Sequence, residues 1–279
     1  MLCVIVAAGR IGDYARHRAL LAGVARPDLV LCADGGLAHL ERLGLEADEI
    51  LGDFDSADPA ALDSFARRGA AIRRFPRDKD YTDTELAVNR AISGGCARIL
   101  ILGGLGARSD HATANIQLAF KSLDSGARVV LADEYSMVAV IRNETLVISR
   151  RRLLQSMLCG DGGGACCGAP AGERVGGRSA GGDPPGAAQG HCGGESVAPA
   201  VAGVEVGAPP SPAISILPIG GEAAGVCTRG LKYPISGMTL PASYTTGVSN
   251  EFLPCAETAS VSVDSGALLI MVSCCGATR

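Results

Sequence analysis

Acidic residues and glycines recur in four short segments of this 279-residue chain, and each segment follows an apolar run. The segments read ADGG at 33–36, GDFDS at 52–56, KDYTD at 79–83 and GGLGARSDH at 103–111. Carboxylates provide the oxygen ligands that Mg²⁺ prefers, and glycines let a backbone approach phosphate groups closely. These segments therefore predict a site for a metal ion and a phosphorylated ligand.

The second segment holds two carboxylates, Asp53 and Asp55, separated by Phe54. In an extended loop, residues i and i+2 point to the same side, so the two side chains would be able to share a Mg²⁺ ion. The alternative is an Asx turn that only begins the following helix. The equivalent positions of Asp34 and Asp83 after other apolar runs favour the metal site.

Two of the segments have the form of phosphate-binding loops. Asp34 and Gly35 follow an expected strand and precede an expected helix, whose N-terminus would favour an anion. Gly104 lies in the glycine-rich fourth segment, where Arg108 would pair with phosphate oxygens through two nitrogens. Asp110 would either orient Arg108 or take part in the site directly.

Four further residues, in three segments, have two open interpretations each. His111 is either a general base or a cap or ligand contact at the start of a helix. Lys79 is either a nucleotide contact or part of a solvated charged loop. Ser249 and Asn250, in the segment GVSNE, either hydrogen-bond an organic substrate or form an ordinary hairpin turn.

The first half of the chain must position these groups, and its pattern is that of an α/β fold. Near-continuous apolar runs predict strands at 2–7, 29–33, 49–51, 71–75, 98–102 and 128–132. Helical segments between them indicate a Rossmann-like parallel sheet with helices on both faces. Asp58 with Pro59 and Thr82 with Glu85 are helix start signals, and a third helix is expected to open at Ser109 or Asp110. Ligands of such sheets bind outside the carboxyl ends of the strands, where all four segments fall.

The second half is expected to be a smaller all-β sandwich. Residues 137–141 and 145–149 predict a hairpin, and short strands resume from 214 to 272. Between them, a segment at about 155–212 is rich in Gly, Ala and Pro without apolar periodicity, so we expect it to be disordered. We divide the chain into an α/β domain at 1–135 and a β-sandwich domain at 136–279, interrupted by this insertion.

Composition limits the partners of the protein. Net charge is −4, which argues against a nucleic acid or an anionic membrane held by bulk charge. No run reaches the roughly 18–20 apolar residues that a membrane helix needs. The apolar N-terminus lacks the basic region of a signal sequence and is interpreted as a buried first strand. The 11 cysteines follow no disulfide spacing, so a reducing cytoplasm is the expected compartment.

Together these motifs resemble the thiamine pyrophosphokinase family, and the resemblance extends to GLKYP at 230–234 and GVSNE at 247–251. The resemblance implies ATP as donor, thiamine as acceptor, and a homodimer with active sites between the subunits. It implies that Asp53, Asp55 and Asp83 hold Mg²⁺ and form the catalytic set with Arg108. Thiamine would be held by Ser249 and Asn250, supplied by the partner subunit. We assign nucleotide contacts to Asp34, Gly35, Lys79, Thr82, Gly104, Arg108, Asp110 and His111.

The implied reaction is attack of the thiamine hydroxyl on the β-phosphorus of ATP, with AMP leaving. Either Asp83 or Asp55 would accept the hydroxyl proton. Two alternatives remain open. A pterin-alcohol pyrophosphokinase would use a similar catalytic domain without needing Ser249 and Asn250, and a thiamine- or nucleotide-binding protein would lack turnover.

Overall fold

The computed structural model describes residues 1–55, 57–78, 80–106, 108–159 and 212–273. All of them belong to one compact unit of the chain. Most of the segment that is predicted to be disordered, from residue 160 to residue 211, lies outside the described residues. Lys79 lies outside them as well, so its predicted nucleotide contact is not addressed by the structure.

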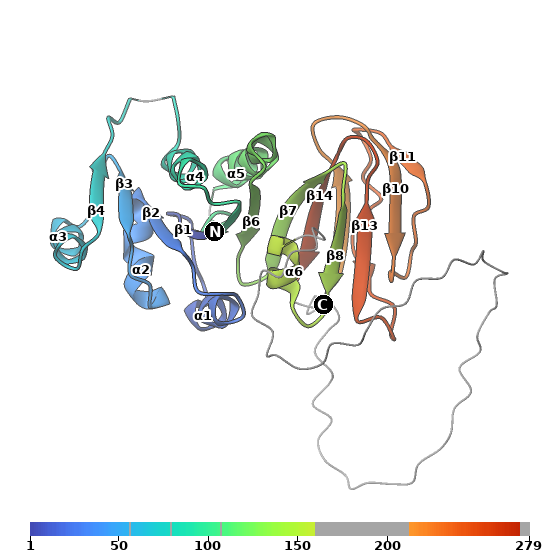
Figure 1. The fold of residues 1–279 in the computed structure, drawn as a ribbon, viewed down its shortest axis with the longest axis horizontal. Coiled ribbons are helices and arrows are strands. Elements are labelled where there is room, and N and C mark those ends of the chain that lie inside the picture. The colour runs from blue at the N-terminus through green and yellow to red at the C-terminus, as the bar shows by residue number, and fades with distance from the viewer. Residues whose placement is uncertain (56, 79, 107, 160–211, 274–279) are drawn as a thin grey trace, which may run out of the picture. The chain divides into compact units, whose positions relative to one another are not determined.

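Six parallel strands form the N-terminal half, and all six predicted strands are confirmed (Figure 1). In space they follow the order β6-β5-β1-β2-β3-β4. The chain therefore starts in the middle of the sheet, adds β2 to β4 on one side, and then adds β5 and β6 on the other. Strand β1 is buried along its whole length because it is covered on both faces. The strands are β1 (Leu2–Val6), β2 (Leu29–Ala33), β3 (Glu49–Gly52), β4 (Ala71–Arg74), β5 (Arg98–Leu102) and β6 (Arg128–Ala132).

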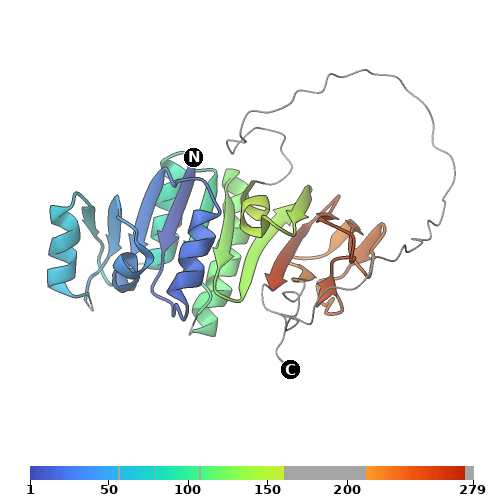
Figure 2. The same cartoon turned by 90° about the horizontal axis from the view of Figure 1, so that it is seen from below.

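Helices cover both faces of this sheet, as the pattern predicted (Figure 2). One face packs against α1 (Tyr14–Ala22), α2 (Leu37–Leu43), α3 (Pro59–Arg67) and α6 (Leu153–Cys159). The opposite face packs against α4 (Asp83–Ser93) and α5 (Ser109–Ser122). Alternate residues of each strand enter the two layers, so Val4 and Leu100 lie in one core and Ile5 and Ile101 in the other.

The predicted helix starts are confirmed in their main features. Asp58 caps α3 by accepting from the Ala60 N–H at 3.0 Å, with Pro59 in the first turn. Thr82 caps α4 by accepting from the Glu85 N–H at 3.1 Å. The Glu85 carboxylate instead pairs with Lys121 Nζ at 2.8 Å, so only one half of the capping box is recorded. Helix α5 begins at Ser109, the first of the two expected positions.

The second half of the chain continues the same sheet. Strand β7 (Ser136–Arg142) pairs antiparallel with β6, and β14 (Ala267–Ser273), β9 (Ala213–Pro218) and β12 (Asn250–Glu251) follow, which gives ten strands. The proposed domain boundary at residue 135 therefore falls between two paired strands of a continuous sheet.

A separate four-stranded antiparallel sheet completes the sandwich, in the order β11-β10-β13-β8. Its strands are β8 (Thr145–Ser149), β10 (Ala223–Arg229), β11 (Met238–Leu240) and β13 (Thr258–Ser262). The predicted hairpin of residues 137–141 and 145–149 is wrong, because β7 pairs with β6 and β14 whereas β8 pairs with β13. The chain crosses between layers at Asn143, with φ at 52°. This crossing lets Ile148 and Ile141 enter one core from two sheets.

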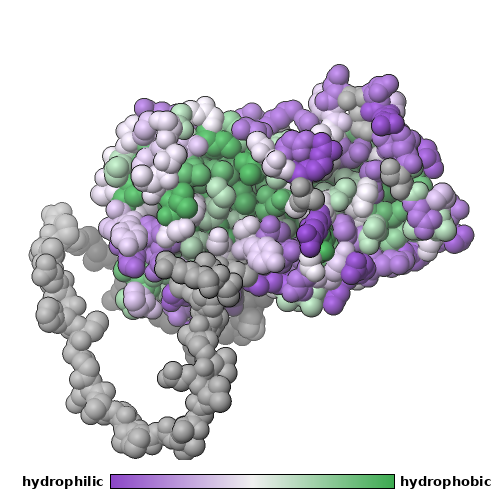
Figure 3. Space-filling view, turned by 180° about the vertical axis from the view of Figure 1, so that it is seen from behind, coloured by the Kyte–Doolittle hydropathy of each residue, from purple (hydrophilic) through white to green (hydrophobic). Residues whose placement is uncertain are grey.

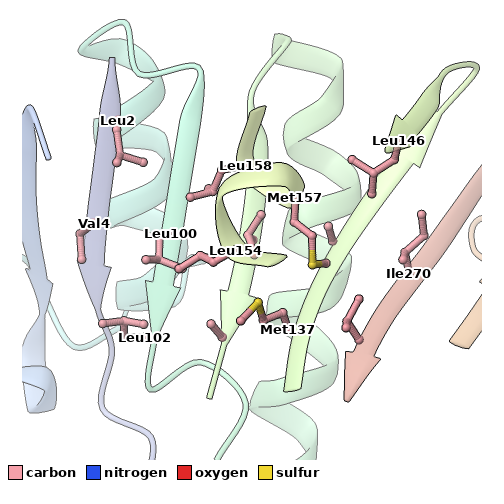
Figure 4. Packing of buried hydrophobic residues seen from close by; sticks show 14 of the residues in the cluster. Leu2, Val4, Leu100, Leu102, Met137, Leu146, Leu154, Met157, Leu158 and Ile270 are labelled. Carbon is pink, nitrogen blue, oxygen red and sulfur yellow. The ribbon is translucent and has the colours of Figure 1, made fainter. Parts of the chain in front are cut away.

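Helix α6 corrects the N-terminal bound of the predicted disordered segment, because residues 155–159 are helical. Leu154, Met157 and Leu158 recur at helical spacing and are buried. Figure 4 shows this helix lying across the sheet, with Leu154 and Leu158 near Leu100 and Met157 near Met137. The short apolar repeat was hidden by the polar residues on each side of it.

The surface of the described residues carries an apolar area. Seen from the side opposite to Figure 1, apolar side chains form a continuous area bordered by hydrophilic ones (Figure 3). Exposed apolar side chains of the C-terminal half include Tyr233, Met238, Val248 and Leu253. No helix in the described ranges is long and apolar enough to cross a membrane.

Candidate active site

The acidic segments follow strands at the carboxyl edge of the parallel sheet, and two of them are in contact. The parallel pairing sets Ala33 of β2 beside Leu51 of β3, so the loops that follow these strands are neighbours. Asp34 Oδ1 accepts a hydrogen bond from the Phe54 N–H at 3.2 Å. A Cβ built on Gly52 would lie 2.7 Å from the Asp34 Cβ, so a glycine is needed for this approach. Asp34 therefore ties two of the predicted loops together.

The loop of Asp53 and Asp55 is a tight turn, and the expectation of an extended loop is wrong. Phe54 has a φ of 60°, and the Asp55 N–H donates to Asp53 Oδ1 at 3.0 Å. This is the geometry of an Asx turn, in which the first carboxylate accepts from the backbone two residues ahead. Asp55 Oδ2 lies 3.6 Å from Arg77 Nη1, and both side chains are more than half exposed.

The third carboxylate, Asp83, is the first residue of α4, directly after its cap Thr82. Among the described residues, no three His, Cys, Asp or Glu side chains gather closely enough to hold a metal ion alone. Mg²⁺ is usually bound by one or two carboxylates together with phosphate oxygens and water. The donor chemistry of Asp53, Asp55 and Asp83 therefore fits a Mg²⁺ ion that a polyphosphate brings with it.

The glycines of the fourth segment have a packing role that the sequence did not indicate. The Gly9 N–H donates to the Gly103 carbonyl at 2.9 Å, and Gly103 has a φ of 68°. A Cβ on Gly9 would lie 2.3 Å from the Gly103 oxygen, and one on Gly106 2.5 Å from the Arg10 oxygen. The loops that follow β1 and β5 therefore pack backbone against backbone, a contact that only glycine permits.

Gly104 and Gly35 sit within this edge. The Gly104 carbonyl accepts from the Asn115 side-chain amide at 2.8 Å, which fixes the loop to α5. Gly35 is exposed in the turn between β2 and α2, where an added Cβ would lie 2.9 Å from the Ala8 Cβ.

Arg108 and Asp110 form a two-point ion pair beside the N-terminus of α5. Arg108 Nε lies 3.1 Å from Asp110 Oδ1, and Nη2 lies 2.6 Å from Oδ2. The hydrogen bonds from Arg108 lower the pKa of Asp110 to about 2, and the same pair raises the pKa of Arg108. The pairing favours the orienting role for Asp110. His111 is exposed in the first turn of the same helix.

A cavity of about 430 Å³ lies at this edge between the loops after β1, β5 and β6. The prediction missed most of its lining, which is Arg10, Gly12, Asp13, Gly106, Asp133, Glu134 and Tyr135. Glu134 Oε1 accepts from the Gly12 N–H at 3.1 Å and links two of the loops. The available signal was the segment GRIGD at 9–13, which has the same glycine and charge pattern after a strand as the four predicted segments.

His39 of α2 holds the loop that forms one wall of this cavity, and none of the predicted motifs included this residue. Its Nε2 lies 3.0 Å from the Gly9 carbonyl oxygen, and its Nδ1 lies 2.7 Å from the Tyr14 hydroxyl. A carbonyl only accepts, so Nε2 carries the hydrogen and Nδ1 of the neutral ring accepts from Tyr14. Burial lowers the pKa of His39, which favours this neutral form.

Ser249 and Asn250 lie where β12 pairs with β9, in the continued part of the sheet. Asn250 is buried, and its amide bridges to the backbone of Tyr233: Oδ1 accepts from the N–H at 3.0 Å and Nδ2 donates to the carbonyl at 2.7 Å. Ser249 is exposed with a φ of 60°, and its N–H donates to Ser215 Oγ at 3.1 Å. Asn250 thus joins the two predicted motifs GLKYP and GVSNE.

Two family models match the chain in the order of its two halves. The model for the thiamin pyrophosphokinase catalytic domain matches residues 23–131, and the model for the thiamin pyrophosphokinase vitamin B1 binding domain matches residues 205–268. Together they span more than half of the chain. The chain belongs to the thiamine pyrophosphokinase family.

Curated members of the thiamine pyrophosphokinase family give the same result over shorter lengths. The Bacillus subtilis thiamine pyrophosphokinase is 30% identical over 105 residues, which cover 38% of this chain and 49% of that protein. Thiamine pyrophosphokinase 1 of Oryza sativa subsp. japonica is 29% identical over 157 residues, which cover 48% of this chain and 59% of that protein. The chain thus spans roughly half of the length of the curated relatives it matches.

Solved structures of the family share the fold. The crystal structure of the Bacillus subtilis enzyme superposes with a TM-score of 0.67 at 20% identity and covers 98% of this chain and 99% of that one. Thiamin pyrophosphokinase from Candida albicans gives a TM-score of 0.64 at 14% identity, over 98% of this chain and 88% of that one. The two-layer C-terminal half and the parallel N-terminal half are therefore the fold of this family.

Proposed function

We propose that the protein transfers a pyrophosphoryl group from ATP to the hydroxyl of thiamine, giving thiamine diphosphate and AMP. The observation that carries this proposal is the joint presence of both family domains on one chain, with four acidic or glycine-rich loops that follow parallel strands at one sheet edge. Residues 1–135 would bind ATP, and residues 136–279 would bind thiamine.

The acidic edge suits positioning and charge neutralisation, which supply most of the catalysis in phosphoryl transfer. Asp53, Asp55 and Asp83 would hold Mg²⁺, whose role is to neutralise charge on the phosphate oxygens. Arg108, held in a fixed orientation by Asp110, would stabilise negative charge that develops on the transferred group. Asp83 or Asp55 would accept the proton of the attacking hydroxyl.

The remaining nucleotide contacts would come from the same edge. Asp34, Gly35 and Gly104 belong to loops that end β2 and β5, and Thr82 and His111 lie at the N-termini of α4 and α5. Helix N-termini favour phosphate groups because their N–H groups point outward. Lys79 stays a predicted contact outside the described residues.

Thiamine would be bound in part by Ser249 and Asn250. The exposed Ser249 is available to a ligand, and Asn250 fixes the turn that presents it. In the homodimer we propose, these residues would complete the active site of the partner subunit. The continuous apolar area on one side of the molecule supports such an interface, because large exposed apolar areas usually mark contact surfaces (Figure 3). The cytoplasm stays the proposed compartment.

The decisive experiment incubates the full chain with ATP, Mg²⁺ and thiamine and identifies both products. We expect AMP and thiamine diphosphate in equal amounts. Release of ADP with thiamine monophosphate would overturn the pyrophosphoryl assignment. Melting-point stabilisation by both ligands without AMP release would favour the binding protein without turnover.

Two matched variants locate the activity. Asp53→Asn should lower kcat by roughly a hundredfold or more while leaving the fold intact. Asp63→Asn changes an exposed carboxylate on α3 and should leave kcat unchanged. A pterin alcohol offered in place of thiamine should not release AMP; faster release with the pterin would support the pterin-alcohol pyrophosphokinase instead.

A further inference from the structure

The cavity of about 430 Å³ lies where the sheet changes the side on which the chain adds strands. Strands β1 and β5 are parallel neighbours, yet the chain leaves β1 for α1 on one face and leaves β5 for α5 on the other (Figure 1). The two loops touch at Gly9 and Gly103, and residues that follow this contact in both loops line the cavity. In open α/β sheets, ligands bind in the crevice at such a topological switch point.

The charged groups of the lining argue against a phosphate ligand. Arg10 is its basic residue, and its acidic residues are Asp13, Asp133 and Glu134. An excess of negative charge repels a phosphate group that no metal ion accompanies. Carboxylates accept hydrogen bonds from an uncharged ligand that carries amino or N–H donors. The lining therefore suits a polar ring rather than a polyphosphate chain.

Asp133 keeps one carboxylate oxygen for such a donor. Its Oδ1 accepts from the Tyr135 N–H at 2.8 Å, from the Ser136 N–H at 2.6 Å and from the Ser136 hydroxyl at 3.1 Å. Its Oδ2 has no hydrogen bond or ion pair within the part of the chain that the structure describes. The three bonds fix the turn after β6, so the second oxygen is held in place at the cavity.

Tyr135 adds an aromatic face to the same lining. The residue is 62% exposed, although tyrosine rings are favoured where another apolar surface covers them. Its backbone N–H is bound by Asp133, so the ring and the carboxylate oxygen are positioned by one turn. Exposed aromatic rings beside polar acceptors are the elements that proteins use to bind a nucleic-acid base, by stacking and by hydrogen bonds to its edge.

We propose that this cavity binds the adenine base of the donor nucleotide, with Tyr135 stacked on the ring and Asp133 Oδ2 accepting from the amino group, an inference that rests on the proposed use of ATP. One strand separates β1 from β3, so the loop after β1 lies about 10 Å from the loop of Asp53 and Asp55. A nucleotide extended along the carboxyl edge would bridge this distance. Its base would lie at the switch point and its polyphosphate beside the acidic loops.

The test of stacking is calorimetric titration of the full chain with AMP and, in a separate arm, with ribose 5-phosphate, which lacks the base. Thiamine is absent, so the result does not depend on turnover. The wild type should bind AMP more tightly than ribose 5-phosphate. Tyr135→Ala should weaken AMP binding about tenfold and leave ribose 5-phosphate binding unchanged, because it removes only the stacking partner. Tyr135→Phe should bind AMP as the wild type does, because it keeps the ring.

The test of the acceptor uses inosine monophosphate, which has a carbonyl oxygen where AMP has the amino group. The wild type should bind it about tenfold more weakly than AMP, because two acceptors would face each other. Asp133→Asn keeps an oxygen for the N–H groups of Tyr135 and Ser136 and places an amide donor where Oδ2 was. It should therefore reduce the preference for AMP. An unchanged preference would overturn the role of Asp133.

Tyr81→Ala is the matched control, because Tyr81 is another exposed tyrosine, in the third acidic segment. It should bind AMP as the wild type does. AMP binding that is lost in Tyr81→Ala but kept in Tyr135→Ala would overturn the proposal, and so would a wild type that binds AMP no better than ribose 5-phosphate. A melting curve precedes each titration, and the Tyr135 variants decide alone if Asp133→Asn does not fold. Each of these outcomes leaves the proposed pyrophosphoryl transfer to its own test, which is the identification of its two products.

Discussion

His39 Nε2 donates to the Gly9 carbonyl at 3.0 Å, and this bond ties helix α2 to the loop that follows the first strand. The same loop packs against the loop after β5 through the bond from Gly9 to Gly103. The Tyr14 hydroxyl, at the start of α1, lies 2.7 Å from the other ring nitrogen of His39. The Arg42 guanidinium in turn lies 3.8 Å from the centre of the Tyr14 ring. A histidine outside the predicted motifs therefore positions one wall of the cavity between the loops that follow β1, β5 and β6.

Replacement of His39 should change how stability depends on pH. Burial is the main cause that lowers the pKa of His39 below its ordinary value of 6.5, so the unfolded chain takes up a proton more readily than the folded one. The free energy of unfolding of the wild type should therefore fall as pH drops below about 6.5. In His39→Gln this fall should be smaller, because glutamine does not titrate but can still donate to Gly9. Urea unfolding between pH 5 and pH 8 checks this, and equal pH dependence in both proteins would contradict it.

His39→Ala gives the complementary result at neutral pH. It should lower the free energy of unfolding by about 1 kcal/mol, because the Gly9 carbonyl loses its donor. It should also raise the KM for ATP more than His39→Gln does, since only the glutamine retains a donor at the loop. Identical KM values for the two variants would mean that the loop is held by its glycine contacts alone.

Gly103→Ala should destabilise the protein by about 2–4 kcal/mol, because it combines overpacking with an unfavourable backbone conformation. Its added Cβ would lie 2.5 Å from the Ala7 carbonyl oxygen, at a φ of 68°. Gly23→Ala is the control, because a Cβ there meets the Leu20 oxygen at an ordinary 3.4 Å. The midpoint of urea unfolding measures both, and a small effect at Gly103 would show that the two loops separate without cost.

Asp110→Asn should separate activity from stability. The ion pair with Arg108 is exposed, with side chains 66% and 64% accessible, so its loss should leave the melting temperature nearly unchanged. The KM for ATP should rise by roughly threefold to tenfold, because Arg108 loses its fixed orientation. The pKa of Asp110 is about 2, so the pair stays ionised between pH 5 and pH 9 and should add no acidic limb to the pH–rate profile. An unchanged KM would argue against a positioning role.

Asn250→Ala should lower stability as well as thiamine binding, whereas Ser249→Ala should lower thiamine binding alone. Asn250 is buried, accepts from the N–H groups of Tyr233 and Glu251 and donates to the Tyr233 carbonyl, so alanine removes three partly buried hydrogen bonds. The free energy of unfolding should fall by about 2–4 kcal/mol, and the KM for thiamine should rise. Ser249→Ala should raise the KM for thiamine without a comparable loss of stability. Urea unfolding and thiamine titrations separate the two effects; equal destabilisation would contradict the assignment.

Much of the N-terminal half was predictable because its signals are local. Apolar runs such as 98–102 are buried on both faces and need no partner to be recognised, and Asp58 and Thr82 act on residues within one turn. Strand pairing in the C-terminal half was less accessible. Strands β7 and β8 are adjacent in sequence, which is typical of a hairpin. They belong to different sheets, because β7 pairs with β14 and β8 pairs with β13.

Sequence alone was enough to predict the parallel sheet, the edge at which its loops lie, and the family that those loops resemble. This was possible because apolar runs, helix-capping residues and loop composition are properties of residues close together in the sequence. The folded structure was needed to show that Asp53 and Asp55 lie in an Asx turn, that Gly9 and Gly103 pack backbone to backbone, and that His39 holds the loop of Gly9. It was also needed to show that Gly106 and Tyr135 line one cavity. Apart from the Asx turn, these relationships join residues tens of positions apart, and their contacts form only when the fold brings those distant segments together.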